Sequence, residues 1–139
     1  MNALERASLF LTLIRELQAL LEREVVLLRA MDIEALRELQ QDKAVLADAY
    51  ETELRALHAS PEFVAELDPG VREALFEAMR ELRATMRENL NALLAAREVV
   101  ERVTRHIAES LAGSEATRRL AALADGPAHV VPLALDRRV

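Results

Sequence analysis

The stretch from Val71 to Leu111 contains neither glycine nor proline, the two residues that most often interrupt a helix. Apolar residues recur along it in alternating steps of four and three, and one polar residue, Asn89, takes a place in the series. The series is Leu75, Met79, Leu82, Met86, Asn89, Leu93, Ala96, Val100, Val103 and Ile107. This heptad pattern predicts one long helix whose apolar stripe needs partners. At about 1.5 Å per residue the helix would be roughly 60 Å long, too long for the core helix of a compact domain.

The composition agrees with long packed helices. Hydrophobic residues make up 52% of the 139 residues but aromatic residues only 3%, with three glycines, four prolines and no tryptophan. Ala, Leu, Glu and Arg dominate, which indicates an all-α fold with an aliphatic core. The net charge is -6. Lys43 is the only lysine, and most arginines alternate with glutamates, which is typical of a solvated, ion-paired face. We therefore expect no nucleic-acid partner.

The chain contains no cysteine. This excludes disulfides, thiolate metal sites and cysteine catalysis, and it fits a reducing cytoplasm. The apolar cluster Leu9 to Ile14 is flanked closely by charged residues and is far too short to span a bilayer. The sequence therefore predicts a cytoplasmic protein without stable membrane insertion.

The first helix is expected at about residues 3–29, with two adjacent apolar seams. One seam comprises Leu4, Ala7, Leu11, Ile14, Gln18, Leu21, Val25 and Leu28, and the other comprises Phe10, Leu13, Leu17, Leu20 and Leu27. Two seams make a face that can contact two other helices at once, as in a bundle.

A second helix is expected at about residues 33–59, with Asp32 as its N-cap. The short connection favours an antiparallel pair of helices. The apolar stripe of this helix comprises Leu36, Leu39, Lys43, Leu46, Tyr50, Leu54 and Leu57. Lys43 lies within the stripe. It is either a lysine whose stem packs while its ammonium reaches water or an acid, or the marker of a family.

The pairs Ser60-Pro61 and Asp68-Pro69 each combine a capping residue with a proline at the first helical position. They predict a short turn of helix at about 61–66 and a compact corner before the long helix at about 69–112. Gly113 is expected to end that helix as its C′ residue. The expected organisation is thus a helical bundle over 1–112 and a partly helical or extended C-terminal tail over 113–139. That tail either packs on the bundle or is a docking peptide.

No catalytic constellation is present, so we expect no enzyme and no cofactor. The histidines His58, His106 and His129 lie in three different segments, and no Glu-x-x-His spacing of the kind used by di-iron bundles occurs. His106 and Glu109 could supply two ligands on one helix face, but a solvated histidine is the simpler interpretation, and we expect no metal site. Asn89 is either a register device within the seam or a group that faces a partner's backbone.

The region Leu17 to Leu57 carries a distinctive pattern. A first helix with Leu-rich repeats around Glu24 is followed by a break at Asp32. A Leu-x-x-Leu-x-x-x-Lys-x-x-Leu pattern then runs from Leu36 through Lys43 to Leu46, and the pair Tyr50-Glu51 completes it. This region resembles the FlgN-like flagellar export chaperones, and in the third helix Asn89 followed by Leu93 and Leu94 is also similar.

The resemblance implies a cytoplasmic three-helix protein that holds hook-filament junction proteins before type III export. It also implies contact with the flagellar export gate, with the C-terminal part contacting clients and gate, often through an aromatic residue. This chain has no Phe, Tyr or Trp beyond Phe76. Such contact would therefore use aliphatic tail residues, namely Val130, Val131, Leu133 and Leu135.

The expected fold is an antiparallel three-helix bundle with a long, coiled-coil-like third helix. Because the first two helices are shorter than the third, its far end would expose an aliphatic stripe for a client's amphipathic helix. The stripe residues are Val99, Val100, Val103, Ile107 and Leu111. The alternative is a structural coiled-coil protein that homo-oligomerises through the same seams, and a homodimer is compatible with either interpretation.

Overall fold

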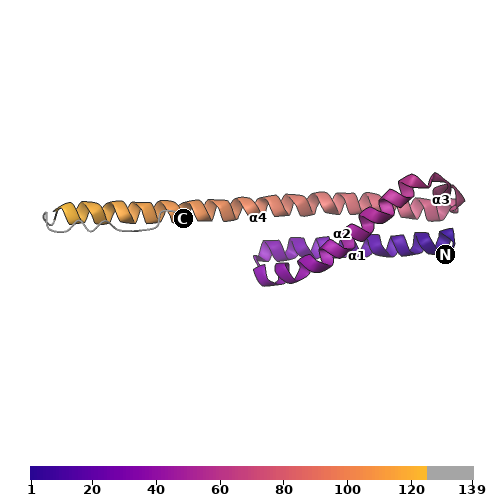
Figure 1. Cartoon of the computed structure of the whole chain (residues 1–139), viewed down its shortest axis with the longest axis horizontal. Coiled ribbons are helices and arrows are strands. Elements are labelled where there is room, and N and C mark those ends of the chain that lie inside the picture. Colours follow the sequence, from indigo (N-terminus) through magenta and orange to yellow (C-terminus); the bar gives the residue numbers. More distant parts are fainter. Residues whose placement is uncertain (125–139) are drawn as a thin grey trace. The chain divides into compact units, whose positions relative to one another are not determined.

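The computed structural model describes residues 1–124 and is all-helical over that range (Figure 1). The elements are α1 (Ala3–Ala30), α2 (Ile33–Ala59), α3 (Pro61–Glu66) and α4 (Pro69–Ala124), and no strand occurs among these residues. The helices pack together, so the prediction of an all-α bundle is confirmed. The chain divides into two compact units, the first ending at Ala96 and the second beginning at Arg97. Each is described by itself below.

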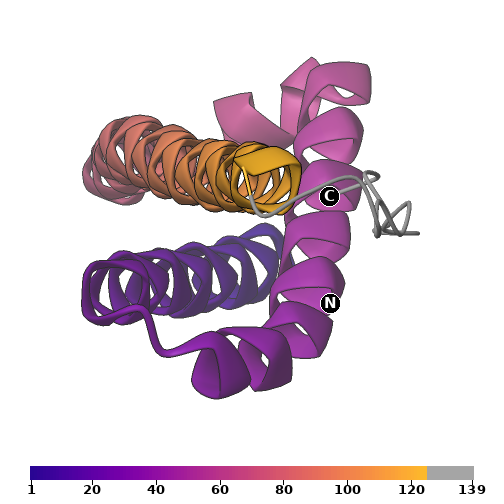
Figure 2. The same ribbon diagram turned by 90° about the vertical axis from the view of Figure 1, so that its left-hand side faces the viewer.

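In the first unit, α1 and the first part of α4 lie side by side, and α2 crosses both on a slant (Figure 2). The side of α1 that packs inward follows a single heptad line. Its buried residues are Ala7, Phe10, Ile14, Leu17, Leu21, Glu24 and Leu27. Most of these residues belong alternately to the two predicted seams. The acidic residue among them, Glu24, belongs to neither seam. The outer residues of the seams are more accessible, and Leu4 is 55% exposed.

The connection between α1 and α2 is short because two residues complete both helix ends. Met31 adopts the left-handed conformation, with φ 55°. The amides of Met31 and Asp32 donate to the carbonyls of Leu28 and Leu27, each at 3.1 Å. This is a Schellman motif. The Asp32 side chain then accepts from the amide of Ala35 at 3.1 Å, which confirms Asp32 as the N-cap of α2.

The predicted stripe of α2 faces inward along its whole length, but only Tyr50 and Leu57 are fully buried. Both lie in the second half of the helix, where α2 approaches the core most closely. The Tyr50 ring packs against Phe10 with 5.8 Å between centroids. Burial raises the pKa of the Tyr50 hydroxyl, although the charge of Arg83 acts in the opposite direction.

The corner between α2 and α4 is compact, and Pro61 and Pro69 begin its helices as predicted, but the side chain of Ser60 makes no capping hydrogen bond. Phe63 and Leu67 are 8% and 4% exposed and belong to the core. Arg72 at the start of α4 donates to the carbonyls of Val64 and Leu67 at 3.2 and 3.0 Å, so it satisfies acceptors at the end of α3. The guanidinium of Arg6 lies 4.8 Å from the centre of the Phe63 ring. These contacts tie the corner to the bundle.

The prediction that Gly113 ends the long helix is wrong, since α4 continues to Ala124. A Cβ at Gly113 would meet nothing within 4 Å, and the residue does not take the left-handed conformation of a C′ glycine. A helical glycine costs only about 1 kcal/mol relative to alanine. The following segment is rich in helix formers, and Thr117 donates its hydroxyl to the Gly113 carbonyl at 2.9 Å. Local propensity after Gly113 therefore outweighs the cost of one glycine.

Candidate functional site

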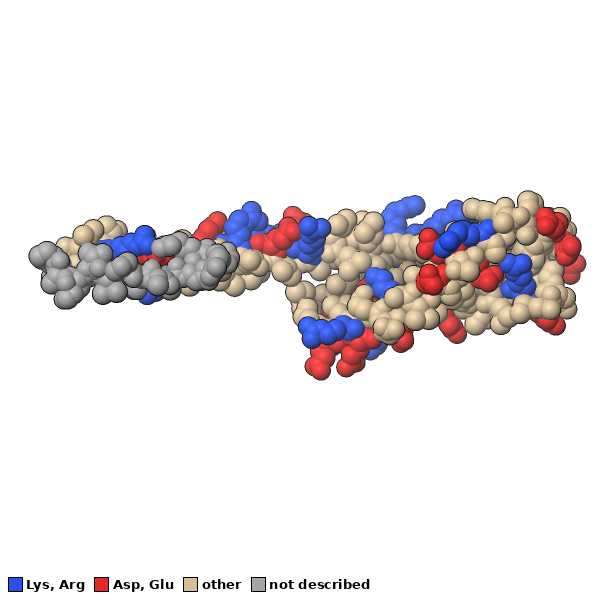
Figure 3. All heavy atoms as spheres, viewed as in Figure 1, with Lys and Arg blue, Asp and Glu red and all other residues tan. Residues whose placement is uncertain are grey.

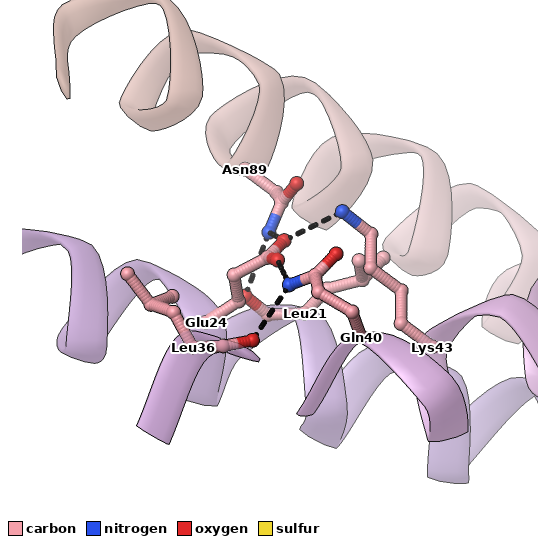
Figure 4. Close-up of polar contacts among 6 residues, drawn as sticks. All are labelled: Leu21, Glu24, Leu36, Gln40, Lys43 and Asn89. Carbon is pink, nitrogen blue, oxygen red and sulfur yellow. Dashed lines mark hydrogen bonds and ion pairs between the residues drawn. The ribbon is translucent and has the colours of Figure 1, made fainter. Parts of the chain in front are cut away.

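Two features differ from an ordinary helical core or an ordinary helix surface. One is a polar cluster in the first unit, made of Glu24, Gln40, Lys43 and Asn89 (Figure 4). The other is the predicted aliphatic stripe on the second part of α4. The two features have opposite character, because the cluster is polar and centred on the buried Glu24 whereas the stripe is apolar and exposed.

Glu24 is the centre of the polar cluster. It follows Leu21 by three residues and Leu17 by seven, so the heptad spacing of α1 places it on the buried line. Its side chain is 0% exposed. A carboxylate removed from water in this way needs partners that replace the lost hydration.

Three donors from two other helices reach the Glu24 carboxylate (Figure 4). The Lys43 ammonium of α2 and the Asn89 amide of α4 both donate to Oε1 at 2.8 Å. The Gln40 amide of α2 donates to Oε2 at 2.8 Å. The same amide groups also bond backbone carbonyls, Asn89 to Leu21 and Gln40 to Leu36, each at 3.0 Å.

Burial by itself raises the pKa of Glu24, because it penalises the charged form. The hydrogen bonds from Gln40, Lys43 and Asn89, together with the charge of Lys43, outweigh that effect and hold the pKa below its ordinary value. Glu24 is therefore ionised at neutral pH. Within residues 1–124, no buried side-chain nitrogen or oxygen lacks a hydrogen-bond partner.

This arrangement shows what Lys43 and Asn89 contact within the chain. The stem of Lys43 packs while its ammonium reaches an acid, which is the first of the two interpretations given for this residue. Asn89 is 4% exposed and bonds the backbone of α1 within the chain, so it links two helices at a fixed register. The Glu24 carboxylate is inaccessible to solvent, and we interpret the cluster as the element that aligns α1, α2 and α4.

Glu24 and Gln40 were not expected at a buried site. The sequence itself indicates that Glu24 is buried. Glu24 lies on the same line of α1 as Ala7, Ile14 and Leu21, and an acidic residue on that line must be buried if the line packs inward. Gln40 gives no such signal. It lies one residue after Leu39 of the predicted stripe, and the residue is exposed.

The predicted stripe lies in the second unit, on the part of α4 after Ala96. Its five residues are exposed: Val99 41%, Val100 51%, Val103 52%, Ile107 52% and Leu111 49%. Where grey atoms do not cover this part of α4, charged side chains lie along its upper edge in Figure 3 and uncharged atoms along its lower edge. Several of these charges pair along the helix, with Arg97 and Glu101 3.0 Å apart.

The remaining predicted contact residues, Val130, Val131, Leu133 and Leu135, lie outside the described residues. His106 is exposed on α4. Among residues 1–124, no three His, Asp or Glu side chains gather in a way that could hold a metal ion.

A hollow of about 620 Å³ lies between α1 and α2 in the first unit. It is lined by Leu9, Leu13 and Ala49, with Arg6 and Glu53 at 3.6 Å from each other on its rim. Leu9 is 59% exposed. The hollow is open and mostly apolar, and Leu9 on its wall is an exposed leucine of the first unit.

Comparison with known proteins places the chain in no family: no family model, no curated protein and no solved structure matches it.

Proposed function

We propose that this protein is a FlgN-like export chaperone of the flagellar type III system. In this proposal an antiparallel three-helix bundle presents the end of its long helix to a client. The clients are hook-filament junction proteins, whose amphipathic helical termini are kept soluble until export. The flagellar export gate is a further proposed partner.

The observation that carries the proposal is the exposed stripe. Five aliphatic residues, each 41–52% exposed, follow one another on a single face of α4. Large contiguous apolar surfaces are rarely left bare on soluble proteins, and they mark binding sites. A helix laid along such a face is a common recognition mode, with anchors every three or four residues.

The residues on which the family resemblance rests give further support. Glu24, Lys43 and Asn89 belong to the FlgN-like pattern, and in the bundle Lys43 and Asn89 each donate to the Glu24 carboxylate. Residues that act as one cluster form a more specific signature than a Leu/Glu periodicity, which any packed helix shows.

The cytoplasmic location belongs to the same proposal. In the described part of the chain, no helix combines the length and apolar character needed to cross a membrane. The absence of cysteine in the sequence is compatible with a reducing compartment.

The test is co-expression of the full chain with C-terminal fragments of hook-filament junction proteins, followed by light scattering of the purified products. We expect a stable heterodimer. Replacing two stripe residues together, Val103→Ser and Ile107→Ser, is expected to weaken fragment binding at least about tenfold, because both lose apolar contact area. The matched control is Leu9→Ser, which changes an equally exposed leucine in the other unit and is expected to leave binding unchanged.

The opposite outcome favours a second candidate, a structural coiled-coil protein. The steps of three and four between Val100, Val103 and Ile107 are those of a coiled-coil seam. This candidate predicts a homo-oligomer that persists on dilution and ignores every fragment. That result would replace the chaperone proposal.

A further inference from the structure

We propose that the stripe binds the C-terminal helix of its client in parallel with α4, with the client's terminal carboxylate at Arg118. This inference rests on the proposed chaperone function and specifies the chemistry of the partner. It follows from the distribution of charge around and along the second part of α4.

The stripe occupies one arc of the helix without any charged residue. At 100° per residue, its five members fall within an arc of about 120°. The charged residues from Arg97 to Glu115 all lie on the opposite side: Arg97, Glu98, Glu101, Arg102, Arg105, Glu109 and Glu115. An uncharged face of this width selects a partner helix by apolar contact and gives no electrostatic preference along its length.

Toward the C-terminus, Arg118 is the first charged residue on the side of α4 that carries the stripe. It follows Val100 by eighteen residues, which is five full helical turns, and it follows Leu111 by seven. Arg118 is exposed. Its neighbour Arg119 pairs with Glu115, as Arg97 pairs with Glu101. Arg118 makes none of the ion pairs found within residues 1–124 and projects at the C-terminal end of the apolar face.

One cation at one end of an apolar face gives a docked helix a preferred direction. The C-terminus of a helix carries a partial negative charge and free carbonyl oxygens, whereas its N-terminus carries a partial positive charge. A helix that runs parallel to α4 therefore places its partly negative C-terminus at Arg118, which is favourable. An antiparallel helix places its partly positive N-terminus there, which is unfavourable. A free α-carboxylate strengthens the preference, because arginine can bind a carboxylate through two hydrogen bonds.

The distance sets the length of the partner. From Val99 to Arg118 the helix rises about 28 Å, so the docked segment has about twenty residues. The inferred ligand is thus a helix of about five turns, with apolar residues every three or four positions and a chain end at its last turn. A segment from the middle of a protein lacks that carboxylate and is expected to bind less tightly.

The test uses the full chain and two synthetic peptides. Both peptides comprise the twenty C-terminal residues of the junction protein that co-purifies, one with a free carboxylate and one with a carboxamide. Calorimetric titration is expected to show the amide binding about fivefold more weakly to the unchanged chain. With Arg118→Gln the two peptides are expected to bind equally, and with the control Arg119→Gln the fivefold difference is expected to remain.

The results separate this inference from the proposed function. If both peptides bind the unchanged chain equally, or if the difference survives Arg118→Gln, the chaperone proposal stands and the carboxylate contact is overturned. If neither peptide binds and no fragment co-purifies, the proposed function itself fails. If Arg118→Gln alters only self-association, the stripe is an interface between copies, and the inference is overturned as well.

Direction can be measured independently, because the chain has no native cysteine. Single substitutions Val99→Cys and Ser114→Cys mark the two ends of the stripe. A peptide with a cysteine next to its C-terminus is expected to form a disulfide with Ser114→Cys and not with Val99→Cys. The reverse pattern would contradict a parallel arrangement.

Discussion

The two parts of α4 carry one continuous seam but expose it very differently. Up to Asn89 most of the seam is buried, with Leu75, Met79 and Leu82 each no more than 4% exposed and Met86 half-buried. After Ala96 the same spacing continues, yet Val103 and Ile107 are each 52% exposed. The difference lies in what covers the face rather than in the residues themselves. A periodic apolar face therefore predicts that a partner is needed, without predicting whether that partner belongs to the same chain.

The largest expected effect separates these two parts directly. Leu82→Ala removes a side chain that is 0% exposed and should lower the free energy of unfolding by about 3–5 kcal/mol. Ile107→Ala, on the same seam but in its exposed part, should change it by less than about 0.5 kcal/mol. Urea unfolding of both variants measures this. A cost at Ile107 similar to that at Leu82 would mean that the stripe is already covered in solution.

A second effect concerns the polar cluster, which places the charged Glu24 among the buried residues of α1. Lys43→Met keeps the apolar stem but removes the ammonium from Glu24, which has 0% exposure. Because a buried charge then loses its counter-charge, we expect a loss of about 2–4 kcal/mol in unfolding free energy. The control Arg55→Met breaks an exposed pair with Glu51 and should cost less than about 0.5 kcal/mol. Equal costs in the two variants would show that the cluster contributes no more than a surface ion pair.

A smaller effect depends on pH. The pKa of Glu24 is lowered in the folded state, so its contribution to stability is complete above the ordinary carboxyl pKa and is lost as pH falls through the folded pKa. We therefore expect the unfolding free energy to fall less steeply below about pH 4.5 in Glu24→Gln than in the unchanged chain. Denaturant titrations from pH 7 to pH 3 measure the difference. Parallel curves would rule out a lowered pKa at Glu24.

The smallest expected effect is a gain. Met31 adopts φ 55°, a conformation that costs an L-residue with a side chain about 1 kcal/mol. Met31→Gly should therefore raise the unfolding free energy by about 0.5–1 kcal/mol, whereas Met31→Ala should leave it nearly unchanged. Thermal unfolding of both variants tests this. A gain from alanine as well would assign the effect to the methionine side chain instead of the backbone.

The sequence predicts the helices well because caps and prolines act locally. Asp32, Pro61 and Pro69 mark helix starts that the structure places at the same residues or one residue later. Gly113 misleads because one glycine is a weak stop signal when strong helix formers follow it. The exposure of Val103 and Ile107 agrees with the prediction. The direct contact of Glu24 with Asn89 could not be predicted, because it depends on how two helices distant in sequence align.

That contact also has a consequence for the order of events during synthesis. Gln40 and Lys43 lie 16 and 19 residues from Glu24, whereas Asn89 lies 65 residues away. At about 5–20 residues per second, the ribosome takes on the order of several seconds to pass from Lys43 to Asn89. During that interval a nascent hairpin of α1 and α2 can neutralise Glu24 but has no α4 to cover Ile14, Leu17 and Leu21. The newly made chain is thus most open to proteases and to aggregation just before the helix that carries its proposed binding surface is complete.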